Sequence, residues 1–266
     1  MFSFFHTYSP DPIVFTIGSF GIHWYGLLLG CSAILGYVLV SKLAPRFALS
    51  AEQATDVYVS LFVGGLVGAR IYHVLLALPE YAAHPASIIA IWEGGLAIHG
   101  GVIGGAAVLW YYARKYHTSF VTYADLFVLP LLLGQAIGRW GNYFNQELFG
   151  APTARAWGIF IDQAHRPLSY IEYRFFHPTF LYESLWNIVS FGILLLILRA
   201  RKRQPGTLLW AYVALYSVGR FAMEFIRIDT PPVVFGVRFP MLLSGVLFLC
   251  AMGMILKTLT ANHKQK

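Results

Sequence analysis

The chain has 266 residues, of which 58% are hydrophobic and only 12% are charged, and its formal net charge is +7. Soluble globular proteins carry roughly 25% charged residues, so this composition argues against a soluble domain. The positive charge does not point to nucleic acid as a partner, because no basic run is interleaved with stacking aromatic residues. In a membrane protein, basic residues orient the chain through their excess on cytoplasmic loops.

Apolar segments long enough to cross a bilayer recur along the chain. A span needs about 20 mostly apolar residues to cross a hydrocarbon core of about 30 Å. The sequence therefore predicts an all-α polytopic membrane protein, with residues 1–266 as a single integral membrane domain and a small extramembrane head inserted at residues 139–177. The seven expected spans are 22–42, 55–78, 95–113, 122–138, 178–199, 206–226 and 239–258.

The lysines predict the orientation of these spans. All six lie on one set of connections and the C-terminal tail, whereas the opposite set carries arginine as its only strongly basic residue. Because cytoplasmic loops are enriched in Lys and Arg, we expect the N-terminus and the head outside and the C-terminus in the cytoplasm. The lysines are Lys42, Lys115, Lys202, Lys257, Lys264 and Lys266.

Ionisable and polar side chains gather near the outer ends of the expected spans. A charged residue inside a span costs about 2.5–3.5 kcal/mol on insertion scales, and such residues face a cavity or each other. Several at one depth therefore indicate a shared polar cavity that opens to the outer leaflet. Taken singly, Arg70 is interpreted as a structural or snorkelling residue. The group comprises His23, Tyr25, Arg70, His73, His99, Arg139, His177, Glu183, Arg220 and Glu224.

The third apolar segment begins EGGLAIHGGVIGG, which places His99 among glycines. The pairs Gly100–Gly104 and Gly101–Gly105 are small-xxx-small motifs, which let helices approach closely. Two interpretations of His99 remain open. It is either a packed histidine bonded to a neighbouring carbonyl, or an imidazole with open space around it for a ligand.

A dense polar cluster, GRWGNYFNQELFG, follows the fourth segment at residues 138–150. Arg139, Asn142 and Gln146 have the spacing of one helical face, whereas Asn145 and Glu147 do not fit it. With three glycines in the cluster, we interpret it as a helix end that unwinds into a loop. Irregular backbone at membrane depth is tolerated where it lines a protein cavity.

The fifth segment begins with HPT at residues 177–179, a typical helix start with proline in the first turn. Thr179, Glu183 and Asn187 then share one face, and Tyr182 lies beside them.

In the sixth segment Tyr212, Tyr216, Arg220 and Glu224 recur every fourth residue, and Arg227 follows three residues later. Arg220 and Glu224 are either an ion pair that only stabilises the fold, or an anion-binding arginine held in position by the glutamate.

Several common catalytic motifs are absent from the sequence. It has no CxxC, no HExxH and no GxSxG, and no carboxylates at metal-ligand spacing, so we expect no metal site. What remains is arginine, suited to bidentate phosphate binding, and histidine, suited to proton transfer near neutral pH. These groups suit a phospholipid headgroup together with a proton-transfer step.

At this point GRWGNYFNQELFG closely resembles the signature of the prolipoprotein diacylglyceryl transferase family, G-R-x-G-N-F-x-N-x-E-x-x-G. Further blocks follow the family's order: HWYG at 23–26, HGG at 99–101, HPTFLYE at 177–183 and GRFAMEFIR at 219–227. Two positions depart. Tyr143 stands where phenylalanine is usual, and Met241 stands where the family often has a glutamine three residues before a serine.

The resemblance implies a reaction and a place in the cell. The diacylglyceryl group of phosphatidylglycerol would be joined to the lipobox cysteine thiol in the signal peptide of a prolipoprotein, and glycerol phosphate would leave. This would be the first step of bacterial lipoprotein maturation, at the outer face of the cytoplasmic (inner) membrane. The substrates and the bilayer would be the partners, with no metal or organic cofactor.

The resemblance also suggests roles for residues. His99 would accept the thiol proton, because the thiolate is the nucleophile. Arg139 and Arg220, in either order, would bind the phosphate and its growing charge. Further residues would contact the substrate or support those that do. They are Tyr25, Asn142, Asn145, Glu147, Gly150 and Glu224 around the headgroup and the arginines, with His177, Tyr182, Glu183 and Arg227 in support.

Two other classes of function fit parts of the sequence. A transporter or flippase for an anionic lipid or solute would also use buried arginines and glycine-broken helices. However, no inverted repeat is visible, and the polar groups stop in the outer half of the spans. A purely structural scaffold would leave the costly intramembrane charges unexplained. The transferase is therefore favoured.

Overall fold

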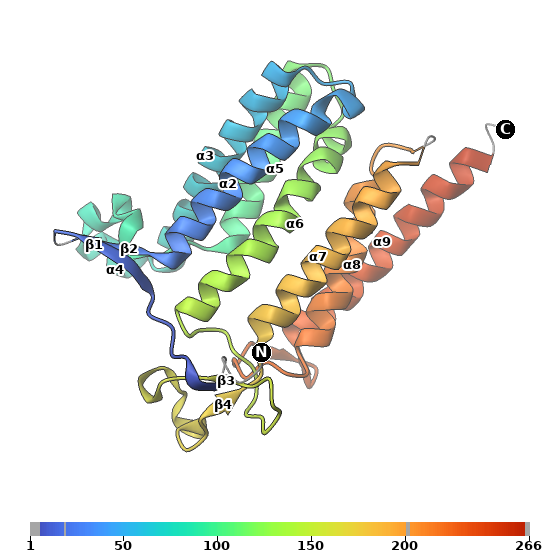
Figure 1. Cartoon of the computed structure of the whole chain (residues 1–266). Coiled ribbons are helices and arrows are strands. Elements are labelled where there is room, and N and C mark those ends of the chain that lie inside the picture. Colours follow the sequence, from blue (N-terminus) through green and yellow to red (C-terminus); the bar gives the residue numbers. More distant parts are fainter. Residues whose placement is uncertain (1–5, 19, 201–202, 264–266) are drawn as a thin grey trace. The chain divides into compact units, whose positions relative to one another are not determined.

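The structure is a computed structural model that describes residues 6–18, 20–200 and 203–263 (Figure 1). Its contacts divide the chain into two compact units, and each is described by itself. Unit 1 comprises the chain up to Gly36 and again from Val128 onward, and unit 2 comprises Tyr37–Phe127. Three of the lysines that predict the orientation, Lys202, Lys264 and Lys266, lie outside the described residues.

Each of the seven expected apolar segments forms a helix, which confirms the all-α class of membrane protein. Five of these helices, α2, α3, α6, α7 and α9, are long and apolar enough to cross a membrane. The helix α8 has 17 residues, and α5 ends in Arg114 and Lys115, so seven spans remains a prediction. The long helices are α2 (Trp24–Leu43), α3 (Ala51–Leu76), α5 (Ile98–Lys115), α6 (Phe120–Phe144), α7 (Thr179–Leu198), α8 (Thr207–Met223) and α9 (Phe239–His263).

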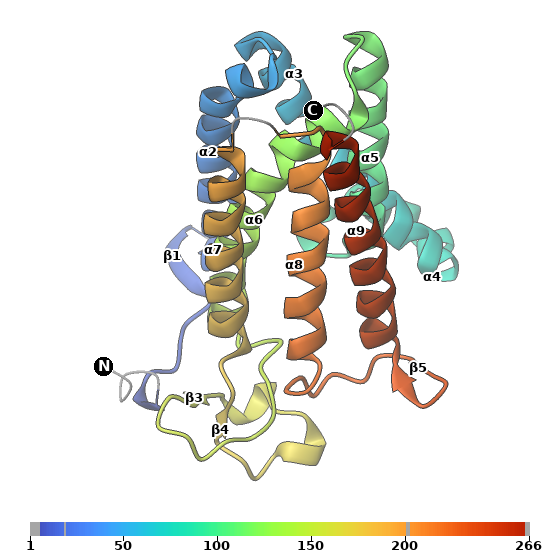
Figure 2. The same cartoon turned by 90° about the vertical axis from the view of Figure 1, so that its right-hand side faces the viewer.

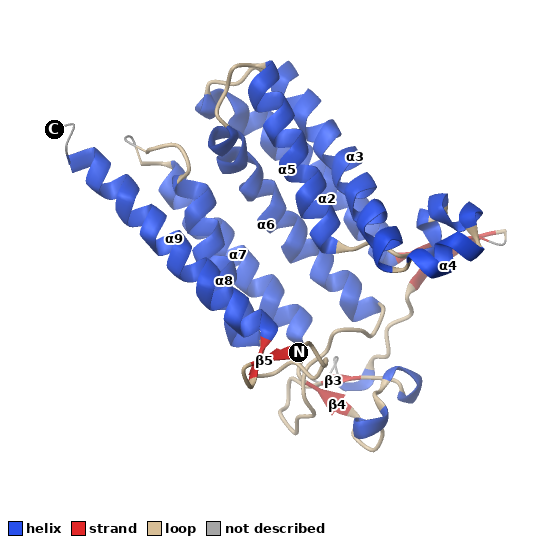
Figure 3. Cartoon of the chain, turned by 180° about the vertical axis from the view of Figure 1, so that it is seen from behind, coloured by secondary structure: helices blue, strands red, loops and turns tan. Residues whose placement is uncertain are grey.

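Short elements connect these helices (Figures 2 and 3). Each pair of strands forms a two-stranded antiparallel hairpin. The hairpins are β1 (Ile13–Ile17) with β2 (Phe20–His23), β3 (Ile159–Phe160) with β4 (Phe175–Phe176), and β5 (Val233–Val234) with β6 (Val237–Arg238). The short helices are α4 (Leu78–Ala83), η1 (Ala44–Phe47), η2 (Pro85–Ile89), η3 (Ile91–Glu93), η4 (Gln163–His165) and η5 (Leu168–Tyr170).

Unit 2 is organised by the close packing of α3 against α5. The small-xxx-small motif of α5 meets a matching set of glycines on α3. A Cβ added to Gly68 would lie 3.0 Å from the Cα of Gly104, and a Cβ on Gly64 or Gly100 would likewise crowd the facing helix. The helices can approach this closely only because these positions carry no side chain, as the sequence predicted.

Arg70 organises the segment between α3 and α5. Its side chain is buried, and its guanidinium donates hydrogen bonds to five backbone carbonyls between residues 87 and 95. The bonds from Nη1 to the Gly94 and Gly95 oxygens are 2.6 and 2.9 Å long. The structural interpretation of Arg70 is therefore confirmed, and the snorkelling interpretation is wrong.

The end of α6 differs from the expectation. The helix passes through Gly138 and Gly141 and continues to Phe144, six residues beyond the expected end of its span at 138. Glycine does not break it here, because Gly141 provides room for a neighbouring ring: a Cβ at this position would overlap the ring of Tyr25. Arg139 and Asn142 therefore lie on regular helix, and the chain leaves it only at Asn145.

The head shares a small core in unit 1 with the ends of α6 and α7. Gln146 is buried and left-handed, with a φ of 50°, and fixes the exit from α6 by bonding the head at Asp162. Its Nε2 donates to Asp162 Oδ2 at 2.6 Å, and its Oε1 accepts from the Asp162 amide at 2.6 Å. Gln146 is therefore turned to the head and does not share the face of Arg139, which corrects that expectation. The core beneath comprises Tyr143, Phe149, Ile159, Ile161, Phe176 and Phe180.

Candidate functional site

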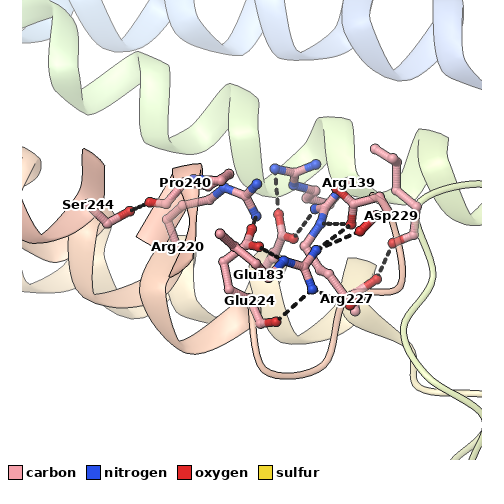
Figure 4. A network of polar contacts seen from close by, with 11 residues as sticks. Arg139, Glu183, Arg220, Glu224, Arg227, Asp229, Pro240 and Ser244 are labelled. Carbon is pink, nitrogen blue, oxygen red and sulfur yellow. Dashed lines mark hydrogen bonds and ion pairs between the residues drawn. The ribbon is translucent and has the colours of Figure 1, made fainter. Parts of the chain in front are cut away.

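A chain of charges of alternating sign runs through unit 1 (Figure 4). Its members come from α6, α7, the end of α8, the loop that follows α8, and β6. We refer to it as the ion-pair chain. In order of contact it comprises Arg139, Glu183, Arg227, Asp229, Arg238, Glu224 and Arg220.

One half of the ion-pair chain is centred on Glu183. This carboxylate, on α7, pairs with Arg139 of α6 and lies 3.1 Å from Arg227 Nη1. Arg227 Nε in turn lies 2.8 Å from Asp229 Oδ1. Glu183 thus joins α6 to the loop after α8. The spacing of residues within one helix could not predict these contacts. The sequence predicted Glu183 as a supporting residue, and that role stays a prediction.

The other half is centred on Glu224, whose side chain is completely buried. Arg220 Nη1 lies 2.5 Å from Glu224 Oε1, one turn earlier on the same face. Arg238 Nε lies 2.7 Å from the second oxygen, Oε2. The expected pairing of Arg220 with Glu224 is therefore confirmed. Arg238 also reaches the first half, with its Nη2 3.8 Å from Asp229 Oδ1.

A cavity of about 160 Å³ in unit 1 lies against both ends of the ion-pair chain. Arg139 lines it from α6 and Arg220 from α8, and both guanidiniums keep some exposure, 30% and 22% of the side chain. Apolar side chains provide much of the remaining wall. The lining residues are Gln135, Arg139, Tyr182, Glu183, Trp186, Asn187, Tyr216, Val218, Gly219, Arg220, Ala222 and Met223.

The amides of the polar cluster are gathered by one carboxylate. Glu147 Oε1 accepts from Asn142 Nδ2 at 2.8 Å and from Asn145 Nδ2 at 3.2 Å. Arg139 Nη1 donates to Asn142 Oδ1 at 3.4 Å, a long bond. The structure therefore brings Asn142, Asn145 and Glu147 together beside Arg139, although Asn145 and Glu147 lie beyond the helix end.

Gly150 lies where the head approaches two helix ends. Its amide donates to the carbonyl of His177 at 2.9 Å, and it forms an isolated bridge with Arg227. A Cβ here would lie 2.6 Å from Ile226 and 3.0 Å from His177 and Thr179. The side chains around Gly150 therefore leave no room for a Cβ, which lets its backbone form the bridge with Arg227.

His177 and Tyr182 connect the head to the cavity wall. The Tyr182 hydroxyl lies 3.1 Å from His177 Nδ1 and accepts from Trp157 Nε1 at 2.8 Å. Burial, followed by the positive charge of Arg155, lowers the pKa of His177 below its usual value. The neutral imidazole is thus favoured, which suits a structural role for His177.

Electrostatics hold the loop after α8 in its charged state. Burial raises the pKa of Asp229, but the hydrogen bond and positive charge of Arg227 outweigh it, and the net pKa is lowered. For Arg227, burial lowers the pKa, whereas the hydrogen bond and charge of Asp229 raise it above its usual value overall. Both groups therefore stay ionised, and their pairing persists across the physiological pH range.

His99 belongs to unit 2, whereas every member of the ion-pair chain belongs to unit 1. It is the second residue of α5 and is exposed. The ring of Tyr72 lies 6.0 Å away, centroid to centroid. Within the described ranges its imidazole makes no hydrogen bond, which leaves no support for the interpretation of a histidine bonded to a carbonyl.

Several residues of the site were not assigned from the sequence. Gln135 and Trp186 line the cavity, and Asp229 and Arg238 complete the ion-pair chain. Gln135 lies one turn before Arg139 on the same face, a spacing that could have indicated it. Trp186 likewise lies one turn after Tyr182 on α7, whereas Asp229 and Arg238 show no periodic signal because they lie in the connection after α8.

Comparison with known proteins gives a consistent result. Residues 12–257 match the family model described as prolipoprotein diacylglyceryl transferase. A protein of Gloeobacter violaceus named phosphatidylglycerol–prolipoprotein diacylglyceryl transferase is 44% identical over 84% of this chain and 83% of its own length. A protein of the same name from a Synechococcus species is 42% identical over 91% of this chain and 90% of its own.

Proposed function

This chain belongs to the prolipoprotein diacylglyceryl transferase family, and we propose that it transfers the diacylglyceryl group of phosphatidylglycerol to a cysteine thiol of a prolipoprotein. The names of its relatives specify both substrates. The observation in this molecule that carries the proposal is the cavity flanked by Arg139 and Arg220. A phospholipid presents an anionic phosphate beside apolar chains, and this cavity offers guanidiniums beside an apolar wall.

The two arginines suit the charge changes of the reaction. In the transfer, the thiolate sulfur forms a bond to the glyceryl carbon while the bond from that carbon to the phosphate oxygen breaks. The electron pair leaves with the phosphate, so negative charge grows on the departing glycerol phosphate. Arg139 and Arg220, prepositioned by Glu183 and Glu224, would stabilise that charge as it develops.

The remaining polar residues have supporting roles in this proposal. The amides of Asn142 and Asn145, held by Glu147, would bind the hydroxyls of the headgroup. Tyr25, whose ring packs on Gly141, would also donate a hydrogen bond to the headgroup. The thiol proton is assigned to His99, and this assignment rests on the HGG motif of the sequence and not on the position of His99.

We further propose the setting in which the reaction occurs. The helices α5 and α8 would complete seven spans, with the N-terminus and head outside. The site would then face the outer leaflet of the bacterial inner membrane, where the lipobox cysteine of a signal peptide emerges. This topology rests on the lysine distribution along the sequence.

The products of the reaction test this function. Vesicles of phosphatidylglycerol labelled with ¹⁴C in the acyl chains and ³²P in the headgroup phosphate are mixed with the purified protein and a lipobox peptide. We expect ¹⁴C in the peptide and an equal amount of ³²P in water-soluble glycerol phosphate. A peptide with serine in place of the cysteine is the control. If both labels stay together while the lipid changes leaflet, the protein is a flippase and the proposal is wrong.

A further inference from the structure

Arg238 is placed beside the site by a tight hairpin. β5 and β6 pair Val233 with Arg238 and Val234 with Val237. The two turn residues, Phe235 and Gly236, have φ of 52° and 75°, as a two-residue hairpin turn of the primed type requires. The pairing fixes the position of Arg238 directly before α9.

The guanidinium of Arg238 binds the end of α8 at several points. Nη1 donates to the carbonyls of Glu224 at 3.2 Å and Arg227 at 2.9 Å, and Nη2 donates to the carbonyl of Asp229 at 2.7 Å. Nε remains for the Glu224 carboxylate, 2.7 Å away. Because a planar guanidinium has its donors in a fixed fork, these contacts determine where Nε lies.

Glu224 therefore stands between two guanidiniums. One carboxylate oxygen lies 2.5 Å from Arg220 and the other 2.7 Å from Arg238. If the Glu224 carboxylate paired with Arg220 alone, it would offset the positive charge of Arg220. The attraction of Arg220 for a phosphate would then be weaker. With two partners, the single negative charge is divided. The ion-pair chain as a whole has four arginines and three carboxylates, a net charge of one positive.

We propose that Arg238 is a positioning residue that shares Glu224 with Arg220 and so leaves Arg220 cationic toward the substrate phosphate. This inference rests on the proposed function for the identity of the anion. Without Arg238, the net charge of the ion-pair chain falls to zero. Arg220 is then the only arginine of the ion-pair chain that pairs with Glu224. Arg238 does not line the cavity, so its effect reaches the phosphate through Glu224 and Arg220.

Direct binding of the product anion tests the inference. Glycerol phosphate is titrated calorimetrically into the purified protein, in micelles free of anionic lipid. We expect Arg238→Gln to weaken binding roughly 5- to 150-fold, the usual size of the coupling between a bound ligand and a group that acts on it indirectly. Arg238→Lys, which keeps the charge but not the fork, should recover part of the loss. Arg174→Gln removes an exposed arginine of the head and should bind as the wild type does.

A charge-restoring double variant separates this role from a merely structural one. Arg238→Gln combined with Glu224→Gln returns the net charge of the ion-pair chain to one positive. We expect the double variant to bind glycerol phosphate more tightly than Arg238→Gln alone. If Arg238 only held the loop in shape, the double variant would bind glycerol phosphate no better than Arg238→Gln alone. The double variant has also lost the Glu224 carboxylate, so the loop would be no better ordered.

The outcomes distinguish the inference from the proposed function. Unchanged glycerol phosphate binding in folded Arg238→Gln, with the thermal midpoint as the check on folding, overturns the role of Arg238 whatever the activity. A wild type that binds glycerol phosphate but modifies no peptide overturns the transferase and leaves the role of Arg238 to be judged from the binding series. If Arg238→Gln does not fold, Arg238→Lys against the wild type decides.

Discussion

The two units use arginine in different ways. In unit 2, the guanidinium of Arg70 is bonded to five backbone carbonyls and shows no ion pair among the described residues. In unit 1, Arg139 and Arg220 are held by carboxylates and both line a cavity. Backbone carbonyls occupy the hydrogen-bond donors of Arg70 and order a loop. A carboxylate on one side of a guanidinium leaves donors on its other side available to an anion. We therefore propose that the partner of an arginine, more than its burial, indicates whether its role is structural or functional.

The largest effects are expected at the cavity arginines. Arg139→Ala and Arg220→Ala should each lower the rate of peptide modification about 10²- to 10³-fold, because each removes a preorganised cation from the departing phosphate. The measurement is the initial rate of thioether formation with phosphatidylglycerol vesicles, at matched amounts of folded protein. The exposed Arg174→Ala is the matched control. If both variants kept their activity, the cavity arginines would not act on the phosphate, and the contrast with Arg70 of unit 2 would be wrong.

His99 tests whether unit 2 also contributes chemistry. His99→Gln should lower the rate at neutral pH by about 10² or more, the usual contribution of a general base. The residual rate should rise with pH as solvent deprotonates the thiol, whose usual pKa is about 8.5. The measurement is the pH–rate profile of the variant beside that of the wild type. Full activity of His99→Gln at neutral pH would dismiss the assigned base.

Arg70 should show the opposite behaviour to the cavity arginines. Arg70→Met keeps the apolar stem but leaves buried carbonyls without a donor, at about 1–3 kcal/mol for an unsatisfied group. We expect a clearly lower thermal midpoint and a near-normal rate per folded molecule. Thermal unfolding and activity are measured on the same preparation. A variant of normal stability that has lost activity would mean that Arg70 acts on substrate.

The smallest expected effect is a loss of stability of the head at low pH. Hydrogen bonds from Ser9 and then Gln146 lower the pKa of Asp162 below its usual value. A carboxyl with a depressed folded pKa stabilises the head fully above its unfolded pKa of about 3.9, and this stability is lost as pH falls through the folded value. Hydrogen exchange of the β3 and β4 amides, corrected for intrinsic rates, should show less protection at pH 3 than at pH 6. Asp162→Asn should flatten that difference, and an unchanged one would refute the coupling.

The sequence predicted the helices well, for a physical reason. Bilayer thickness imposes a minimum length on an apolar run, so seven helices could be located without any tertiary information. The pairing of Arg220 with Glu224 was also predictable, because residues four apart on one helix are neighbours. The end of α6 was misplaced because glycine was interpreted as a helix breaker, whereas Gly141 serves packing against Tyr25.

The rest of the site depends on contacts between segments far apart in the sequence. The pairing of Glu183 with Arg139 joins two helices, and no local spacing encodes it. The partners of Arg70 are backbone carbonyls, which every residue has, so its role had no signature in the sequence. Arg238 lies in a short hairpin without periodicity, and only the fold reveals that it shares Glu224 with Arg220.

The most direct test of the central claim is the position of the lipid phosphate. A crystal structure grown in a lipidic mesophase doped with phosphatidylglycerol would locate it. We predict a phosphate in the cavity of unit 1, with its oxygens about 3 Å from the guanidiniums of Arg139 and Arg220. Phosphatidylglycerol bound elsewhere, with this cavity empty or filled by acyl chains alone, would contradict the account.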